Sequence, residues 1–260
     1  MTIPDDIHTE ILKRINDAEL EHNVKVLYAV ESGSRAWGFA SQNSDYDVRF
    51  IYAHPKDWYV AVELESKRDV IEYDIIDEID INGWDVRKAL KLFRKSNPTF
   101  VEWLHSPIVY IDDEHFAHRS RLLLDDIYSV EKGIYHYRSM AKTNYSQYLK
   151  KPEVLMKKYF YCLRPLLSIL WLEKYQRPAP IEFERLRAMV VDNAELNTAI
   201  EDILIRKKTS REKDLITPIQ ILHAFIETEL DRLKYFSLTP EKKDDGIHQL
   251  NELFHATLSG

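Results

Sequence analysis

The stretch Gly33–Tyr52, GSRAWGFASQNSDYDVRFIY, constrains the fold of this chain more than any other. It follows an apolar, β-rich run, Val24–Val30, and it ends in a second such run, DVRFIY; the two predict neighbouring buried strands. The pair Gly33-Ser34 breaks the first run and leads into a short turn or helix. Alternate residues of a strand point to the same face, so Asp45 and Asp47 present two carboxylates side by side.

Two adjacent carboxylates repel each other unless a cation neutralises them. Apolar residues follow this pair directly, which is not expected of an exposed surface turn. Hard oxygen ligands of this kind suit Mg²⁺, with phosphate oxygens completing its coordination. Gly33 lets a phosphate approach the backbone, and Ser34 adds a hydroxyl at the start of the following turn. An isolated Asp-x-Asp is more often a solvated turn, so the order strand, Gly-Ser, Asp-x-Asp, strand is the specific signal.

Hydrophobic periodicity predicts the other elements of the N-terminal part. An amphipathic helix is expected over residues 5–22, and a second runs from Asp85, its N-terminal cap, to about Arg94. Ser96-Asn97-Pro98 ends that helix. Further strands are expected over 60–64, 70–76 and 78–81.

After about Asp112 the strand signals become scarce. Pro165 predicts a kink or a new helix start, and Ser237–Gly246 has the composition of a polar linker. Leu250, Leu253 and Phe254 have the spacing of a short docking helix. Helices are expected near 114–126, 131–149, 153–175, 181–190, 194–206 and 217–236.

These elements predict an α/β (α+β) chain in which a small mixed-sheet domain precedes an all-helical domain. We expect the sheet domain over residues 1–112, the helical domain over 113–236, and a linker and C-terminal tail over 237–260.

The composition of the chain excludes several classes of function. The net charge of −7 argues against a general nucleic-acid coat. Lys132–Arg164 nevertheless holds eight basic residues against one acid, Glu153, which suits either a local anionic ligand or a solvated helix face. The single cysteine, Cys162, excludes a disulfide framework and a multi-cysteine zinc site. The chain has neither a membrane-length apolar run nor a secretory signal, so we expect a cytoplasmic protein without a membrane partner.

The motif resembles the signature of the polymerase-β-like nucleotidyltransferase superfamily: Gly-Ser, a spacer, Asp-x-Asp, and a third carboxylate on a later strand. The chain is most similar to the predicted nucleotidyltransferases associated with RNA ligases, the RlaP family. The similarity spans about residues 25–190. Its pieces are GSRAWGFASQNSDYDVRFIY, then DINGWDVRKALKLFRKSNPTFVEWLHSPIVY from Asp80, and KKYFYCLRPLLSILW from Lys157.

The resemblance implies Mg²⁺-dependent transfer of a nucleoside monophosphate from a nucleoside triphosphate, such as ATP, to an acceptor hydroxyl, with Mn²⁺ as a possible substitute. Asp45 and Asp47 match the metal-binding acids, and Gly33 and Ser34 match the phosphate-holding pair. We expect Asp80 to be the third catalytic, metal-binding acid. It stands between Ile79 and Ile81, so its side chain can face the site while those of the isoleucines face the core. Three neighbouring acids stay open as rivals: Asp74, Asp77 and Glu78.

Several basic and aromatic residues complete the expected nucleotide-binding set. Lys157, Tyr161 and Arg164 share one face of a predicted helix and can clamp a triphosphate or stack on a base; a plain solvent-facing stripe is the alternative. Arg35 follows the Gly-Ser turn, where it reaches either a phosphate or a nearby acid. We expect Arg49 to neutralise the carboxylates of its own strand.

The acceptor stays open among an RNA end, a protein side chain and a small molecule. The family association favours RNA repair or processing, with an RNA ligase as a partner. Two other functions remain: protein nucleotidylation, and a non-catalytic nucleotide-binding adaptor of an RNA ligase.

Overall fold

The computed structural model describes residues 3–41, 43–209, 215–237 and 246–259, and the chain forms two compact units. Unit 1 comprises Met1–Ala36, Asp45–Tyr128 and Lys243–Gly260. Unit 2 comprises Trp37–Ser44 and Ser129–Lys242. The division does not follow chain order, because the segment between the Gly-Ser turn and Asp45 belongs to unit 2.

Unit 1 is built on a five-stranded mixed sheet with the order β3-β4-β2-β1-β5. The central pair, β2 and β4, is parallel, and the other neighbouring pairs are antiparallel. The expected mixed sheet is therefore confirmed. The strands are β1 (Lys25–Glu31), β2 (Tyr46–Ala53), β3 (Val70–Glu72), β4 (Ile79–Asp85) and β5 (Val109–Asp112).

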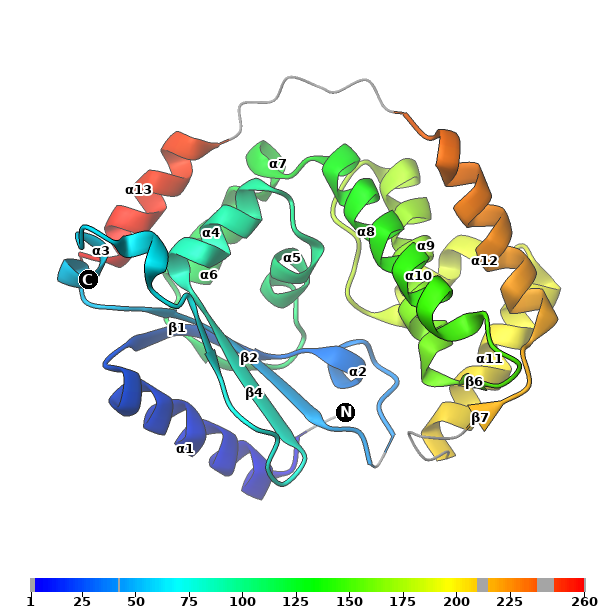
Figure 1. The fold of residues 1–260 in the computed structure, drawn as a ribbon, viewed down its shortest axis with the longest axis horizontal. Coiled ribbons are helices and arrows are strands. Elements are labelled where there is room, and N and C mark those ends of the chain that lie inside the picture. Colours follow the sequence, from blue (N-terminus) through cyan, green and yellow to red (C-terminus); the bar gives the residue numbers. More distant parts are fainter. Residues whose placement is uncertain (1–2, 42, 210–214, 238–245, 260) are drawn as a thin grey trace. The chain divides into compact units, whose positions relative to one another are not determined.

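Helices cover both faces of this sheet (Figure 1). Helix α1 (Asp5–His22) buries Ile11 and Ile15 in one core with alternate residues of the strands, among them Val48, Phe50 and Ile81. The opposite face meets α4 (Val86–Arg94) and α5 (Pro98–Leu104). The alternation of each strand therefore decides which side chains enter the α1 core and which face the other way.

The second face carries the polar residues of β4. Asp80, Asn82 and Trp84 alternate with buried isoleucines, and the Trp84 ring lies 4.0 Å from that of Trp103 in α5. Asp85 then ends the strand and caps α4, as predicted, by accepting a hydrogen bond from the backbone N–H of Arg87. Strand, cap and helix follow one another without a loop.

Two strand predictions need correction, and one strand was missed. Residues 60–64 form no strand: they lie in the turns after α3 (Lys56–Tyr59) and at the start of η1 (Leu64–Ser66), and Val60 and Val62 are exposed. The strand expected over 70–76 stops at Glu72, because the chain enters a tight turn closed by hydrogen bonds between Ile76 and Ile79. Strand β5 was not predicted.

The remaining helices of unit 1 are α2 (Gly33–Ala36), α6 (Phe116–Leu122), α7 (Leu124–Ile127) and α13 (Ile247–Thr257). The predicted C-terminal docking helix is confirmed, since α13 buries Leu250 and Leu253 and contacts α4. Gly246 precedes it at φ +66°, and a Cβ there would lie 2.3 Å from the Ile127 side chain. The linker predicted before it lies mostly outside the described residues.

In the described residues of unit 2, the regular structure is helical apart from one short antiparallel pair, β6 (Val154–Leu155) with β7 (Leu215–Ile216). Helix α9 passes through Pro165 without a new start. Among the described residues, none of the helices is long and apolar enough to cross a membrane. The other elements are α8 (Val130–Asn144), the π-helical turn η2 (Tyr145–Leu149), α9 (Lys157–Tyr175), α10 (Phe183–Arg187), η3 (Ala188–Val190), α11 (Ala194–Thr209), α12 (Gln220–Arg232) and η4 (Leu233–Tyr235).

Candidate active site

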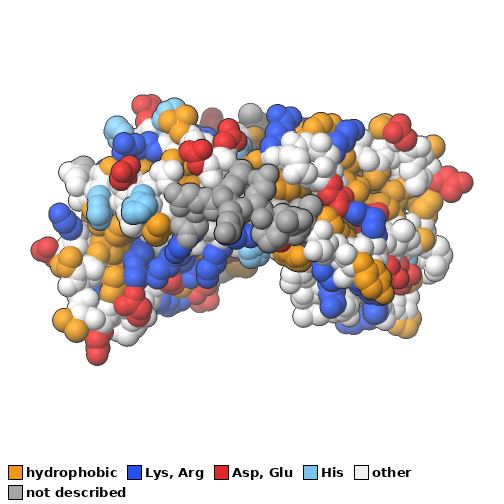
Figure 2. Space-filling view, turned by 90° about the horizontal axis from the view of Figure 1, so that it is seen from above, with side chains coloured by type: hydrophobic (Ala, Val, Ile, Leu, Met, Phe, Trp, Pro, Cys, Tyr) orange, Lys and Arg blue, Asp and Glu red, His pale blue; other side chains and the backbone are white. Residues whose placement is uncertain are grey.

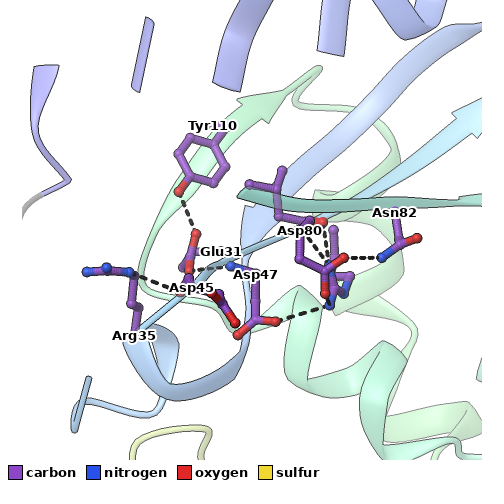
Figure 3. A network of polar contacts seen from close by, with 9 residues as sticks. Glu31, Arg35, Asp45, Asp47, Asp80, Asn82 and Tyr110 are labelled. Carbon is purple, nitrogen blue, oxygen red and sulfur yellow. Dashed lines mark hydrogen bonds and ion pairs between the residues drawn. The ribbon is translucent and has the colours of Figure 1, made fainter. Parts of the chain in front are cut away.

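Two carboxylates lie next to each other on the parallel strands at the centre of the sheet. Asp47 of β2 and Asp80 of β4 are register partners, so their side chains point to the same face. Their side chains are 28% and 20% exposed, which leaves both within reach of a ligand. Asp80 therefore lies outside the buried core, beside the Asp-x-Asp motif (Figure 3).

Arg49 connects the two acids. Its Nη2 donates to Asp47 Oδ1 at 3.2 Å and to Asp80 Oδ2 at 2.7 Å. Its Nη1 also donates to the backbone carbonyl of Asp80 at 2.8 Å. Asn82 Nδ2 donates to the other oxygen of the Asp80 carboxylate, Oδ1, at 2.6 Å. Arg49 therefore pairs with Asp47 of its own strand, as expected, and also with Asp80 of the neighbouring strand.

Asp45 stands at the entrance to β2, directly before its first residue, Tyr46. The carbonyl of Asp45 accepts a hydrogen bond from Arg35 Nε at 3.3 Å. The Arg35 guanidinium lies over the Tyr46 ring, 3.8 Å from its centroid. Helix α2 and the start of β2 are thus joined through one arginine, which sits beside the acids (Figure 3).

The Gly-Ser turn packs directly on Asp47. Gly33 has φ +57°, a region that favours glycine, and a Cβ at this position would lie 1.9 Å from Asp47 Oδ2. The backbone N–H of Ser32 donates to the Asp47 carbonyl at 2.8 Å. Within the described part of the chain the Ser34 hydroxyl makes no hydrogen bond, and this residue is half-buried. The residue after Gly33 therefore carries a hydroxyl without a partner in the described chain.

Glu31, the last residue of β1, is a site residue that the sequence analysis missed. It is fully buried, and its Oε1 accepts the backbone N–H of Asp47 at 2.9 Å. Its Oε2 accepts the Tyr110 hydroxyl at 2.6 Å. Burial raises the pKa of Glu31 from 4.5 to about 7, although the hydrogen bonds from Tyr110 and Asp47 oppose that rise. The sequence contained one signal for this residue: an acidic residue at the end of an apolar strand, just before a Gly-Ser turn.

The predicted helix face with Lys157, Tyr161 and Arg164 lies in α9 of unit 2. Tyr161 is 38% exposed and packs edge-on against Trp37, with 5.6 Å between ring centroids. Arg164 is only 4% exposed: its guanidinium lies 4.1 Å from the Trp37 ring centroid, and Nη2 donates to the Ile181 carbonyl. The face is therefore accessible at Tyr161 and closed at Arg164.

The donor chemistry of the unit 1 acids suits a divalent cation, since Asp45, Asp47 and Asp80 supply only carboxylate oxygens. Among the described residues, however, no three His, Cys, Asp or Glu side chains converge closely enough to hold a metal ion. The guanidinium of Arg49 supplies the positive charge between Asp47 and Asp80 instead. A cation shared by these two acids would compete with Arg49 for their oxygens.

Comparisons with known proteins identify the family of the chain. Residues 7–256 match the model of RlaP, the RNA repair pathway DNA polymerase beta family. The uncharacterized protein YcgL of Bacillus subtilis (strain 168) is 48% identical over 249 residues, covering 95% of this chain and 94% of YcgL. A nucleotidyltransferase-like protein from Exiguobacterium sibiricum 255-15 is 13% identical, with a TM-score of 0.36 over 90% of this chain and 83% of its own, too distant to bear on the fold. The chain belongs to the RNA repair pathway DNA polymerase beta family.

Proposed function

We propose that this protein is a nucleotidyltransferase that moves a nucleoside monophosphate from a nucleoside triphosphate onto an acceptor hydroxyl. One observation carries the proposal: Asp47 and Asp80 stand in register on adjacent parallel strands, with the Gly33-Ser34 turn packed against Asp47. Membership of a polymerase-β family supports the same reaction class.

In the proposed reaction, the acceptor oxygen attacks the α-phosphorus in line and forms a new P–O bond. The bond between the α-phosphorus and its bridging oxygen breaks, and pyrophosphate leaves. Asp45, Asp47 and Asp80 would hold Mg²⁺ or Mn²⁺, and such a cation stabilises charge on the attacking and leaving oxygens. Asp80 would orient the acceptor hydroxyl and take up its proton.

The other predicted site residues are assigned to binding the nucleoside triphosphate. Gly33 and Ser34 would hold phosphate oxygens, because the turn packs against Asp47 at Gly33 and the next residue carries a hydroxyl without a partner in the described chain. Arg35 would reach the triphosphate from its position over Tyr46. On α9, we assign Lys157 and Tyr161 to nucleotide contact. Because Arg164 is buried against Trp37, we assign it to supporting Lys157 and Tyr161.

The family description favours an RNA end as acceptor, and an RNA ligase is the expected partner. One observation favours a second candidate, a non-catalytic nucleotide-binding adaptor: Arg49 lies where a cation between Asp47 and Asp80 would bind. An enzyme must release that contact when substrate arrives, whereas an adaptor need not.

Transfer of label from nucleoside triphosphates labelled at the α-phosphate tests the proposal. The protein is incubated with Mg²⁺ or Mn²⁺ and a cell extract, and the products are divided into RNA, protein and small-molecule fractions. We expect label in one fraction and about a 100-fold loss in Asp45→Asn/Asp47→Asn. The double variant Asp74→Asn/Asp77→Asn has the same charge change on exposed residues and should retain transfer. No label in any fraction, with nucleotide still bound, would favour the adaptor.

A further inference from the structure

Unit 2 contains a cavity that the proposed reaction does not use. Across the face shown in Figure 2, Lys and Arg side chains are mixed with Asp, Glu and His, so surface charge alone singles out no binding site. The cavity is more specific: it measures about 410 Å³, within the range of small-molecule sites. Its charged lining consists of Arg138, Lys142, Lys150, Lys234, Glu227 and Asp231.

The lining has an excess of positive charge that the protein itself does not neutralise. Asp231 is paired with Lys234 at 2.6 Å, and Glu227 accepts the hydroxyl of Tyr145. Over the described residues, Arg138, Lys142 and Lys150 have no carboxylate partner. Four cations and two carboxylates therefore line this concave surface, which leaves it a net charge of +2.

The spacing of these cations is itself unfavourable without a ligand. Arg138 and Lys142 are four residues apart on α8, so they lie on the same face of the helix. Like charges at this spacing destabilise a helix by a few tenths of a kcal/mol. An anion between the two side chains would turn that repulsion into attraction.

A π-helical turn supplies the remaining lining. Helix α8 continues into η2, and such wide turns are frequent at functional sites. Within η2, Tyr145 is buried against His223 and Glu227, while Ser146 stays exposed at the cavity. In the described chain the Ser146 hydroxyl has no hydrogen-bond partner, so it is a free donor next to the three cations.

We propose that this cavity binds a phosphate group, held by Arg138, Lys142 and Lys150 with a hydrogen bond from Ser146. Arginine and lysine are suited to phosphate oxygens, and a hydroxyl completes a common donor set. The phosphate belongs either to a free nucleotide or to the backbone of a polynucleotide. The site shares no residue with the proposed catalytic centre, so a binding measurement tests it whether or not the chain transfers nucleotides.

The test compares the full-length protein with Arg138→Gln/Lys142→Gln, in EDTA to remove metal-dependent binding. Binding of a fluorescein-labelled 12-nucleotide RNA is measured by anisotropy at several salt concentrations, and binding of AMP and inorganic phosphate by calorimetry. Lys174→Gln/Arg177→Gln is the matched control, because it removes the same charges from an exposed part of the same unit. Thermal unfolding of all three proteins verifies that the variants fold.

Losing two phosphate contacts to a single strand should weaken RNA binding about 25-fold at 0.1 M salt and reduce the slope of log K against log salt by about 1.4. The control should bind like wild type. Loss of RNA binding alone identifies a polynucleotide backbone as the ligand, and loss of AMP and phosphate binding identifies a free phosphate. Equal binding by all three proteins, or no binding of any probe by wild type, would overturn the proposal.

Discussion

The buried carboxyl group of Glu31 makes the stability of unit 1 depend on pH, and Glu31→Gln should remove that dependence. Glutamine has the shape of a protonated glutamate. Its carbonyl oxygen can accept the Asp47 N–H, and its amide N–H can donate to the Tyr110 hydroxyl oxygen, the reverse of the present bond from Tyr110 to Glu31. The substitution therefore keeps the contacts and removes only the titration.

The magnitude follows from the pKa. The pKa of Glu31 is about 7 in the folded chain against an ordinary value of 4.5, chiefly because the group is buried. The folded state thus binds this proton more tightly than the unfolded state does. Between pH 4.5 and 7 the free energy of unfolding falls by about 1.4 kcal/mol per pH unit, about 3 kcal/mol in total, and the loss is complete above pH 7.

Urea unfolding of wild type and Glu31→Gln at pH 5, 6, 7 and 8, in EDTA, measures this difference. The advantage of the variant over wild type should grow by about 2.5 kcal/mol between pH 5 and pH 8. Tyr110→Phe removes a hydrogen bond that favours the charged form, so the decline in its stability should extend to higher pH. Parallel stability curves for wild type and Glu31→Gln would refute the reasoning.

Three further predictions concern the site and its support. Gly33→Ala forces a Cβ to within 1.9 Å of Asp47 Oδ2, so the folded variant should lose label transfer; wild-type transfer would contradict the packing described. Arg49→Met leaves Asp47 without its cation, so Mn²⁺ should raise the melting temperature of this variant more than that of wild type; equal rises would contradict competition between guanidinium and metal. Asp85→Ala removes the N-cap acceptor of α4 and the acceptor of the Tyr59 hydroxyl. It should cost about 2–4 kcal/mol in urea unfolding, and a loss below about 1 kcal/mol would argue against this cap.

Local patterns predicted the elements that have one buried face. Helix α1 follows from periodicity, strands β1 and β2 from β-rich apolar runs, and the start of α4 from capping at Asp85, all of which depend on neighbouring residues only. Residues 60–64 show the limit of this reasoning. Their apolar alternation resembles a strand, but no neighbouring strand pairs with them, and Val62 is fully exposed. Strand β5 has four residues, too few for a clear period.

The features that could not be predicted from the sequence depend on contacts between residues far apart in the chain. Glu31 ends a run of apolar residues, and its partner Tyr110 comes 79 residues later. The assignment of Trp37–Ser44 to unit 2 likewise depends on distant contacts, such as the stacking of Phe39 on Phe160. Strand alternation, which is local, favoured Asp80 among the neighbouring acids, and the structure places Asp80 in register with Asp47. Asp77 instead lies in a tight turn at φ 52° and pairs with Arg14.

The most direct test of the account compares the rate of label transfer by wild type, Asp80→Asn and Asp77→Asn. The two substitutions remove the same charge three residues apart, and asparagine tolerates the positive φ of Asp77. If Asp80 acts with Asp47 in nucleotidyl transfer, Asp80→Asn should lower the rate about 100-fold or more while Asp77→Asn stays near wild type. Undiminished transfer by a folded Asp80→Asn protein would contradict the account.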